Sequence, residues 1–163
     1  MTMTTSGTAV VTLPTDTQIL IVREFNAPKR LVYKAWTTPE LIKRWWSGDR
    51  GLVTLAEVDL RVGGTWRYVM TATGGFEVGF HGEFREIVTN ERIVSTEFYE
   101  GMPDSEGAVN TATFTEEGGR TTLSVLVQHA VRSDRDMHIA SGMEGGMQQA
   151  LDHLELVAQS LRD

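Results

Sequence analysis

The chain of 163 residues is long enough to fold as one domain with a full hydrophobic core. It has no cysteine, which rules out disulfides, thiolate metal sites and thiol nucleophiles and is compatible with a reducing cytoplasm. A net charge of −7 argues against binding to nucleic acid or to an anionic membrane through a general electrostatic field.

Residues 1–16 are expected to form a disordered leader in front of one domain that covers residues 17–163. The leader is rich in threonine and small residues and has no helical or clear strand period, so we predict only a little edge pairing within it. The N-terminus lacks a positively charged region, and no apolar run approaches the ~20 residues of a membrane span. The sequence therefore predicts a cytoplasmic protein with no membrane contact.

A strand and two short helices open the predicted domain. Residues 17–25 are rich in β-branched side chains, which predicts a strand. Pro28 suits the first turn of a helix, because its missing N–H would have no partner there. Residues 38–40, Thr-Pro-Glu, are typical of a second helix start, with threonine as the N-cap. We expect this second helix to end at Trp45 and Trp46.

The adjacent Trp45 and Trp46 predict two different contacts. Neighbours on a helix point about 100° apart, because ~3.6 residues make one turn, so the two indoles cannot enter the same layer of one core. We expect one indole to pack beneath the end of the sheet. The other should lie at the mouth of a cavity or at a partner surface, where an indole offers an apolar body and one N–H.

Six further strands are predicted after the helices. Glycine, asparagine or proline marks each turn between them, and consecutive strands with short connections favour an antiparallel meander. The predicted strands cover residues 52–59, 64–73, 76–87, 91–99, 109–116 and 120–129.

Residues 133–163 predict one long amphipathic helix with Ser133 as its N-cap. Three glycines, at positions 142, 145 and 146, lie inside it, and each costs roughly 0.5–1 kcal/mol relative to alanine. We expect either a kink with a close approach to the sheet or a ligand volume that larger side chains would fill. The apolar stripe consists of Ile139, Met143, Met147, Leu151, Leu154, Ala158 and Leu161.

Together these elements predict an α+β fold. A curved seven-stranded antiparallel sheet would wrap around one long C-terminal helix, with two short helices between the first and second strands. One cylinder does not fill a wide concave surface, so we expect space between sheet and helix.

Four stretches of the sequence carry a family resemblance: FNAPKRLVYKAWTTPELIKRWW (25–46), VDLRVGGTWRYVM (58–70), GEFREIVTNERIVSTE (82–97) and GMEGGMQQALDHLELVAQSL (142–161). They resemble the START-related helix-grip superfamily, and specifically bacterial homologues of the ATPase activator of the 90-kDa heat-shock chaperone. The resemblance implies the helix-grip fold, with a ligand cavity beside the long helix or a co-chaperone role in the stress response. Many members of the family carry tryptophan where this chain has Met147, which implies a larger or softer cavity here.

Side chains around the expected cavity are the candidate ligand contacts. Trp66, Tyr68 and Met70 share one face of a strand by alternation, and two methionines of the long helix face the same volume. They predict a pocket for a small apolar molecule, and plain core packing is the alternative. The full candidate set is Trp46, Trp66, Tyr68, Met70, Glu97, His129, Met143 and Met147.

Glu97 and His129 are the polar members of this set. Strand alternation places each on a face with apolar neighbours, where burial would shift its pKa and suit it to acid–base chemistry. The resemblance implies such chemistry for polyketide cyclases of the superfamily, and a hydrogen-bonded core residue is the alternative. A cyclase-like enzyme is our third hypothesis, so we assign no catalytic residue. The four histidines lack metal-ligand spacing, and we predict no metal and no cofactor.

Basic residues on the two short helices support a second hypothesis, a protein-binding module. Lys29, Lys34 and Lys43 lie in a segment with one acidic residue, Glu40, and could contact an acidic surface of a chaperone. A solvated helical face is the alternative. The leading hypothesis is a non-enzymatic domain that binds a small apolar molecule, as a monomer or weak homodimer.

Overall fold

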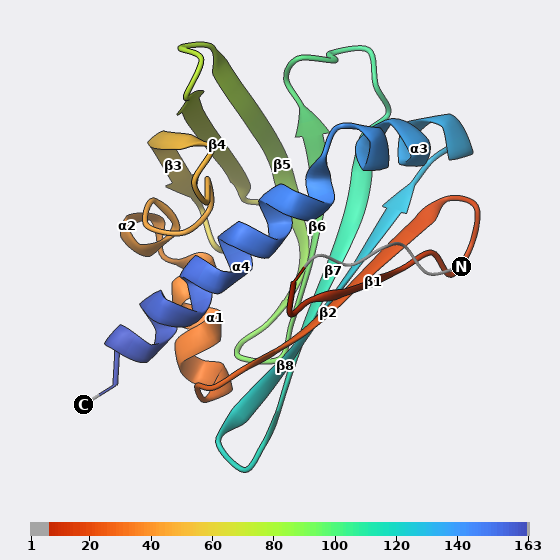
Figure 1. Cartoon of the computed structure of the whole chain (residues 1–163). Helices are drawn as coiled ribbons and strands as arrows, with labels where there is room; N and C mark the ends of the chain where they lie inside the picture. The colour runs from red at the N-terminus through yellow and green to blue at the C-terminus, as the bar shows by residue number, and fades with distance from the viewer. Residues whose placement is uncertain (1–6, 163) are drawn as a thin grey trace.

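The computed structural model describes residues 7–162, which form one antiparallel sheet with helices packed against its concave face (Figure 1). The order across the sheet is β1-β2-β8-β7-β6-β5-β4-β3, so every neighbouring pair except β2–β8 is consecutive in the chain. The strands are β1 (Val10–Thr12), β2 (Gln18–Phe25), β3 (Gly51–Val58), β4 (Thr65–Ala72), β5 (Glu77–Val88), β6 (Arg92–Tyr99), β7 (Ala108–Glu117) and β8 (Arg120–His129). The helices are α1 (Lys29–Thr37), α2 (Pro39–Ile42), α3 (Arg132–Ala140) and α4 (Met143–Ser160). The α+β fold and the meander of seven predicted strands are confirmed.

The eighth strand, β1, lies inside the segment that we predicted as a disordered leader. Residues 10–12 pair antiparallel with residues 20–22 of β2, and the side chain of Val11 is fully buried. The predicted edge pairing is present, but the predicted disorder is wrong for these residues because three alternating apolar side chains, Ala9, Val11 and Leu13, complete the core although the surrounding composition is polar. Residues 1–6 of the predicted leader lie outside the described residues.

The predicted long C-terminal helix is divided into α3 and α4. Gly142 precedes α4 with φ of 82°, a left-handed conformation that a side chain would strain and that ends a regular helix. The second short helix also stops earlier than predicted, at Ile42, and turns carry the chain through Trp45 and Trp46. Thr38 precedes α2 and Pro39 occupies its first turn, as predicted.

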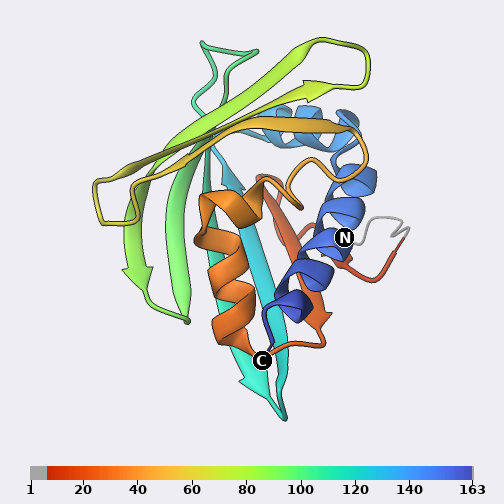
Figure 2. The ribbon, with the colours of Figure 1, turned by 90° about the vertical axis from the view of Figure 1, so that its left-hand side faces the viewer.

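The core lies between the sheet and the helices α1 and α4, which sit side by side in the concavity (Figure 2). Its most completely buried part joins β2, β7 and β8 to the second half of α4. Phe25, Phe114 and Leu154 are each fully enclosed there. Every inner-face residue of β2 from Ile19 to Phe25 is buried by strand alternation, including Arg23.

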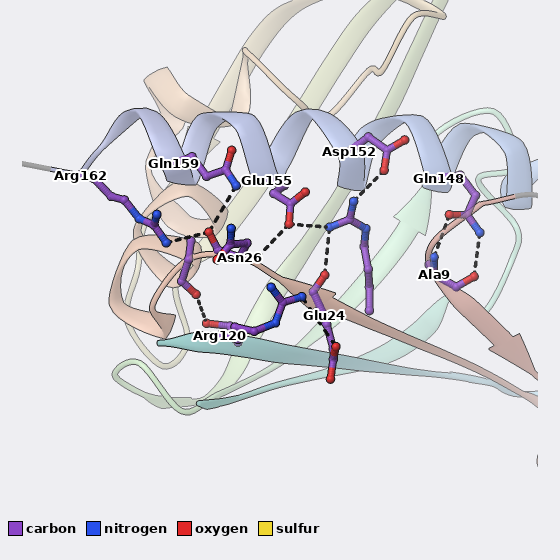
Figure 3. Close-up of polar contacts among 12 residues, drawn as sticks. Ala9, Glu24, Asn26, Arg120, Gln148, Asp152, Glu155, Gln159 and Arg162 are labelled. Atoms are coloured by element: carbon purple, nitrogen blue, oxygen red, sulfur yellow. Dashed lines mark hydrogen bonds and ion pairs between the residues drawn. The ribbon is translucent and has the colours of Figure 1, made fainter. Parts of the chain in front are cut away.

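Polar contacts hold α4 against the β1–β2 side of the sheet. The guanidinium of Arg23, on β2, pairs with Asp152 at 2.7 Å and with Glu155 at 3.6 Å. Further along α4, the buried Gln148 side chain accepts a hydrogen bond from the Ala9 N–H and donates one to the Ala9 carbonyl. Figure 3 shows Gln148 facing Ala9, and Asp152 and Glu155 directed from the helix toward the sheet. The helix is therefore fixed along one flank.

Candidate functional site

The two adjacent tryptophans make different contacts, as predicted, although turns and not a helix carry them. Trp45 is 5% exposed, stacks on Trp36 with ring centroids 5.3 Å apart, and donates its indole N–H to the Ala35 carbonyl at 2.9 Å. Trp46 is half-buried and meets Tyr68 and Phe80 edge-on, at centroid distances of 5.4 and 5.6 Å. Trp45 thus belongs to the core, and Trp46 contacts the inner face of β4 and β5.

A set of half-buried apolar side chains comes from β4, β5, the start of α4 and the turn after α2, and Trp46 contacts two of them, Tyr68 and Phe80. We call it the inner-face cluster, and all its members pack against the core without being enclosed by it. This differs from the β2–β8 side, where the facing side chains are buried. The cluster consists of Trp46, Tyr68, Met70, Phe80, Met143 and Met147.

Trp66, another predicted ligand contact, is a core residue at 6% exposure. Its indole N–H donates to the Thr96 carbonyl at 3.1 Å, and its ring lies 4.7 Å from that of Tyr68. The glycine at position 82 leaves room for this hydrogen bond. A Cβ there would fall 1.8 Å from the Thr96 oxygen and 2.6 Å from the indole nitrogen. Trp66 is therefore a buried neighbour of Tyr68 on the inner face of β4.

The helix glycines contact Arg50, which precedes β3. The Arg50 guanidinium donates to the Gly142 carbonyl at 2.8 Å, and a Cβ on Gly146 would fall 2.8 Å from the guanidinium carbon. The structure shows a break at Gly142 and a close approach to the Arg50 side chain, and not the close approach to the sheet that we predicted.

Glu97 and Asn110 form a polar pair on the inner face. In the β6–β7 register Glu97 lies opposite Ala108 and Ser95 lies opposite Asn110, so the two polar residues are diagonal neighbours. Burial raises the pKa of Glu97, and a hydrogen bond from the Asn110 side chain offsets part of that rise. Burial also raises the pKa of Tyr68, and the charge of Glu97 adds to this effect.

His129 lies on the same row as Glu97, with Ala108 between them. Two strand spacings, about 10 Å, separate the backbones of Glu97 and His129. The Nε2 atom of His129 lies 3.0 Å from Nδ1 of His138 on α3. The histidine thus joins β8 to α3.

Two shallow hollows lie outside the predicted ligand space. One, of about 270 Å³, is lined by residues of β3 and β4 and of their connection, and the other, of about 250 Å³, by residues of β4, β5 and the end of β6. Neither is lined by a residue of α3 or α4. A ligand beneath α4 would contact Met70, Met143 and Met147, whose flexible side chains can adapt to its shape.

The predicted partner-binding lysines differ in their surroundings. The ammonium of Lys29 pairs with Glu91, so its charge is partly neutralised within the chain. Lys34 on α1 and Lys43 after α2 are exposed.

Among residues 7–162, no group of three or more histidine, aspartate or glutamate side chains could hold a metal ion. The described helices include none that is both long and apolar enough to cross a membrane.

Sequence reasoning missed Phe80, Arg50 and Asn110. Alternation would have found two of them, since Phe80 shares a face with Phe84, and Asn110 shares one with Ala112 and Phe114. No local pattern indicates Arg50, because its hydrogen-bond partner, the Gly142 carbonyl, lies 92 residues further along the chain.

A curved antiparallel sheet closed around a C-terminal helix, with two short helices after the first long strand, defines the START-related helix-grip class. The chain belongs to the family described as activator of Hsp90 ATPase homolog 1-like protein, whose model matches residues 26–159. No curated protein matches the sequence.

Solved structures of bacterial proteins share the fold. A protein from Rhodobacter sphaeroides is 25% identical, with 94% of this chain and 99% of that chain covered and a TM-score of 0.86. Protein Ms6760 from Mycobacterium smegmatis is 21% identical, with 94% and 98% covered and a TM-score of 0.82. Protein NE0264 from Nitrosomonas europaea is 22% identical, with 91% and 97% covered and a TM-score of 0.81. The family match supports a ligand-binding or co-chaperone-like module.

Proposed function

We propose that this domain binds a small apolar molecule between the inner face of β4 and β5 and the first half of α4. The observation that carries the proposal is the inner-face cluster, whose apolar side chains stay half-buried while those facing β2 and β8 are enclosed. Arg23 and Gln148 hold the β1–β2 flank of α4, and Asp49 and Arg50, before β3, hold its other flank through Gln149, His153 and Gly142.

Binding affinity would come mainly from apolar surface removed from water. Covering about 100 Å² of such surface contributes roughly 2.5 kcal/mol, at ~25 cal/mol per Å². Aromatic rings and methionines at this site supply a polarisable surface that adapts to ligand shape. The proposed function is binding alone, which requires the burial of apolar surface and no catalytic group.

Replacing Met147 by tryptophan should reduce ligand binding at least about tenfold, because the larger ring occupies the ligand volume. The measurement is native mass spectrometry of protein purified from its own host, comparing the fraction that carries a co-purifying small molecule. Leu156→Trp is the matched control, because Leu156 lies on the same helix but is 64% exposed. Equal occupancy of M147W and L156W would contradict the proposed site.

A protein-binding module remains the alternative, supported by the exposure of Lys34 and Lys43 beside the family match. It predicts a salt-sensitive association with an acidic chaperone surface. Reversing the charge of both lysines would weaken that association, and M147W would leave it intact. The two variants therefore separate the two functions.

A further inference from the structure

A side-chain oxygen without a hydrogen-bond donor lies on the inner face at Asn110, next to Glu97, whose charge acts on Tyr68 of the inner-face cluster. Asn110 is on β7, opposite Ser95 of β6 and Val127 of β8. Ala112 and Phe114, further along the same face of β7, are buried in the core. The Asn110 side chain therefore points to the face that α3 and α4 cover.

The side-chain oxygen of Asn110 is enclosed, and no described residue donates a hydrogen bond to it. Buried acceptors without a donor are uncommon in folded proteins, because such an oxygen loses its hydrogen bonds to water and no protein hydrogen bond replaces them. The Asn110 amide group is oriented by its hydrogen bond to Glu97, which uses the nitrogen and leaves the oxygen free. Asn110 as a whole is half-buried, so a small rotation of its side chain would bring the oxygen to an incoming group.

The charges around Asn110 select the kind of group that can satisfy this oxygen. Glu97 takes part in none of the ion pairs formed within residues 7–162. A ligand carboxylate would bring acceptor oxygens and no donor, so it could not satisfy the Asn110 oxygen, and burying its charge without a partner would be costly. A neutral hydroxyl group supplies the missing donor at no such cost.

We infer that the bound molecule is a neutral apolar alcohol or phenol whose hydroxyl group donates to the side-chain oxygen of Asn110. This inference rests on the proposed function and adds the chemical class of the ligand. The apolar body would lie against the inner-face cluster, and the hydroxyl group would be the end that reaches β6 and β7. The site would then reject fatty acids in their ionised form.

Isothermal titration calorimetry with three matched probes tests the inference: 1-naphthol, its methyl ether 1-methoxynaphthalene, and 1-naphthoate. We expect the wild-type protein to bind 1-naphthol about tenfold more tightly than either of the others, as one hydrogen bond to a buried acceptor provides. Asn110→Leu should make naphthol and its ether bind equally. Ser95→Ala is the control, because Ser95 lies opposite Asn110 and is also half-buried, and it should keep the preference.

Equal binding of naphthol and its ether to the wild-type protein would overturn the donor inference and leave the proposed function in place. Binding of none of the three naphthalenes would contradict the proposed function itself. The wild-type comparison needs no variant, so it decides the matter even if N110L fails to fold.

Discussion

Replacing Trp45 by alanine is expected to lower the free energy of unfolding by about 3–5 kcal/mol, the usual range for deleting a buried aromatic side chain. The indole is 5% exposed, stacks on Trp36 and donates to the Ala35 carbonyl. Its removal leaves a cavity and an acceptor without its donor. Urea unfolding followed by circular dichroism measures the loss.

The same substitution at Trp46 provides the matched comparison. Trp46 is half-buried and contacts Tyr68 and Phe80 by ring edges, so we expect a loss of only about 1–2 kcal/mol. Under the proposed function W46A also weakens ligand binding, because it removes part of the inner-face cluster. Similar unfolding free energies for W45A and W46A would mean that the two indoles are not divided between core and site.

Acidification from pH 7 to pH 5 is expected to destabilise the protein by about 2 kcal/mol through His138, since each unit of pKa difference is worth ~1.4 kcal/mol. Burial and the neighbouring His129 lower the pKa of His138 to about 4, from 6.5. Burial also lowers the pKa of His129, and the charge of Arg135 acts in the same direction while that of Asp134 opposes it. Protonation of either ring would place a charge in the buried contact between β8 and α3.

The direction of this effect follows from proton binding in the two states. Below pH 6.5 the unfolded chain binds protons at both histidines while the folded protein resists them, so stability falls as the pH decreases toward 4. Above pH 6.5 both rings are neutral in both states, and their contribution is constant. Urea unfolding at several pH values should show a smaller decrease for His138→Gln than for the wild type. Identical pH profiles would contradict a buried neutral pair.

Much of this fold is predictable because its signals are local. Alternation of apolar residues locates β2 and β8, and Thr38 with Pro39 marks the start of α2. The division between α3 and α4 was missed because the apolar stripe continues through Gly142, although only the left-handed backbone there separates the helices. The burial of the segment around β1 was missed because it depends on Gln148, which lies 139 residues away from Ala9.

The candidate site is less predictable than the fold. Alternation places Tyr68 and Met70 on the inner face, but it does not distinguish a half-buried side chain from an enclosed one such as Trp66. That difference depends on how α4 is held over the sheet. Arg23 and Gln148 hold one flank of α4 and Arg50 the other, and none of these polar side chains gave a signal of a structural role in the sequence.

Methionine methyl NMR locates the ligand most directly, because methionines lie both inside and outside the proposed site. With ¹³C-methyl methionine in the wild-type protein and 1-naphthol as the probe, we expect saturable shifts of the Met70, Met143 and Met147 signals. Met102 and Met137, which are 38% and 50% exposed and outside the inner-face cluster, should stay unchanged. Shifts confined to Met102 or Met137, or no saturable shift at all, would contradict a ligand site beneath α4.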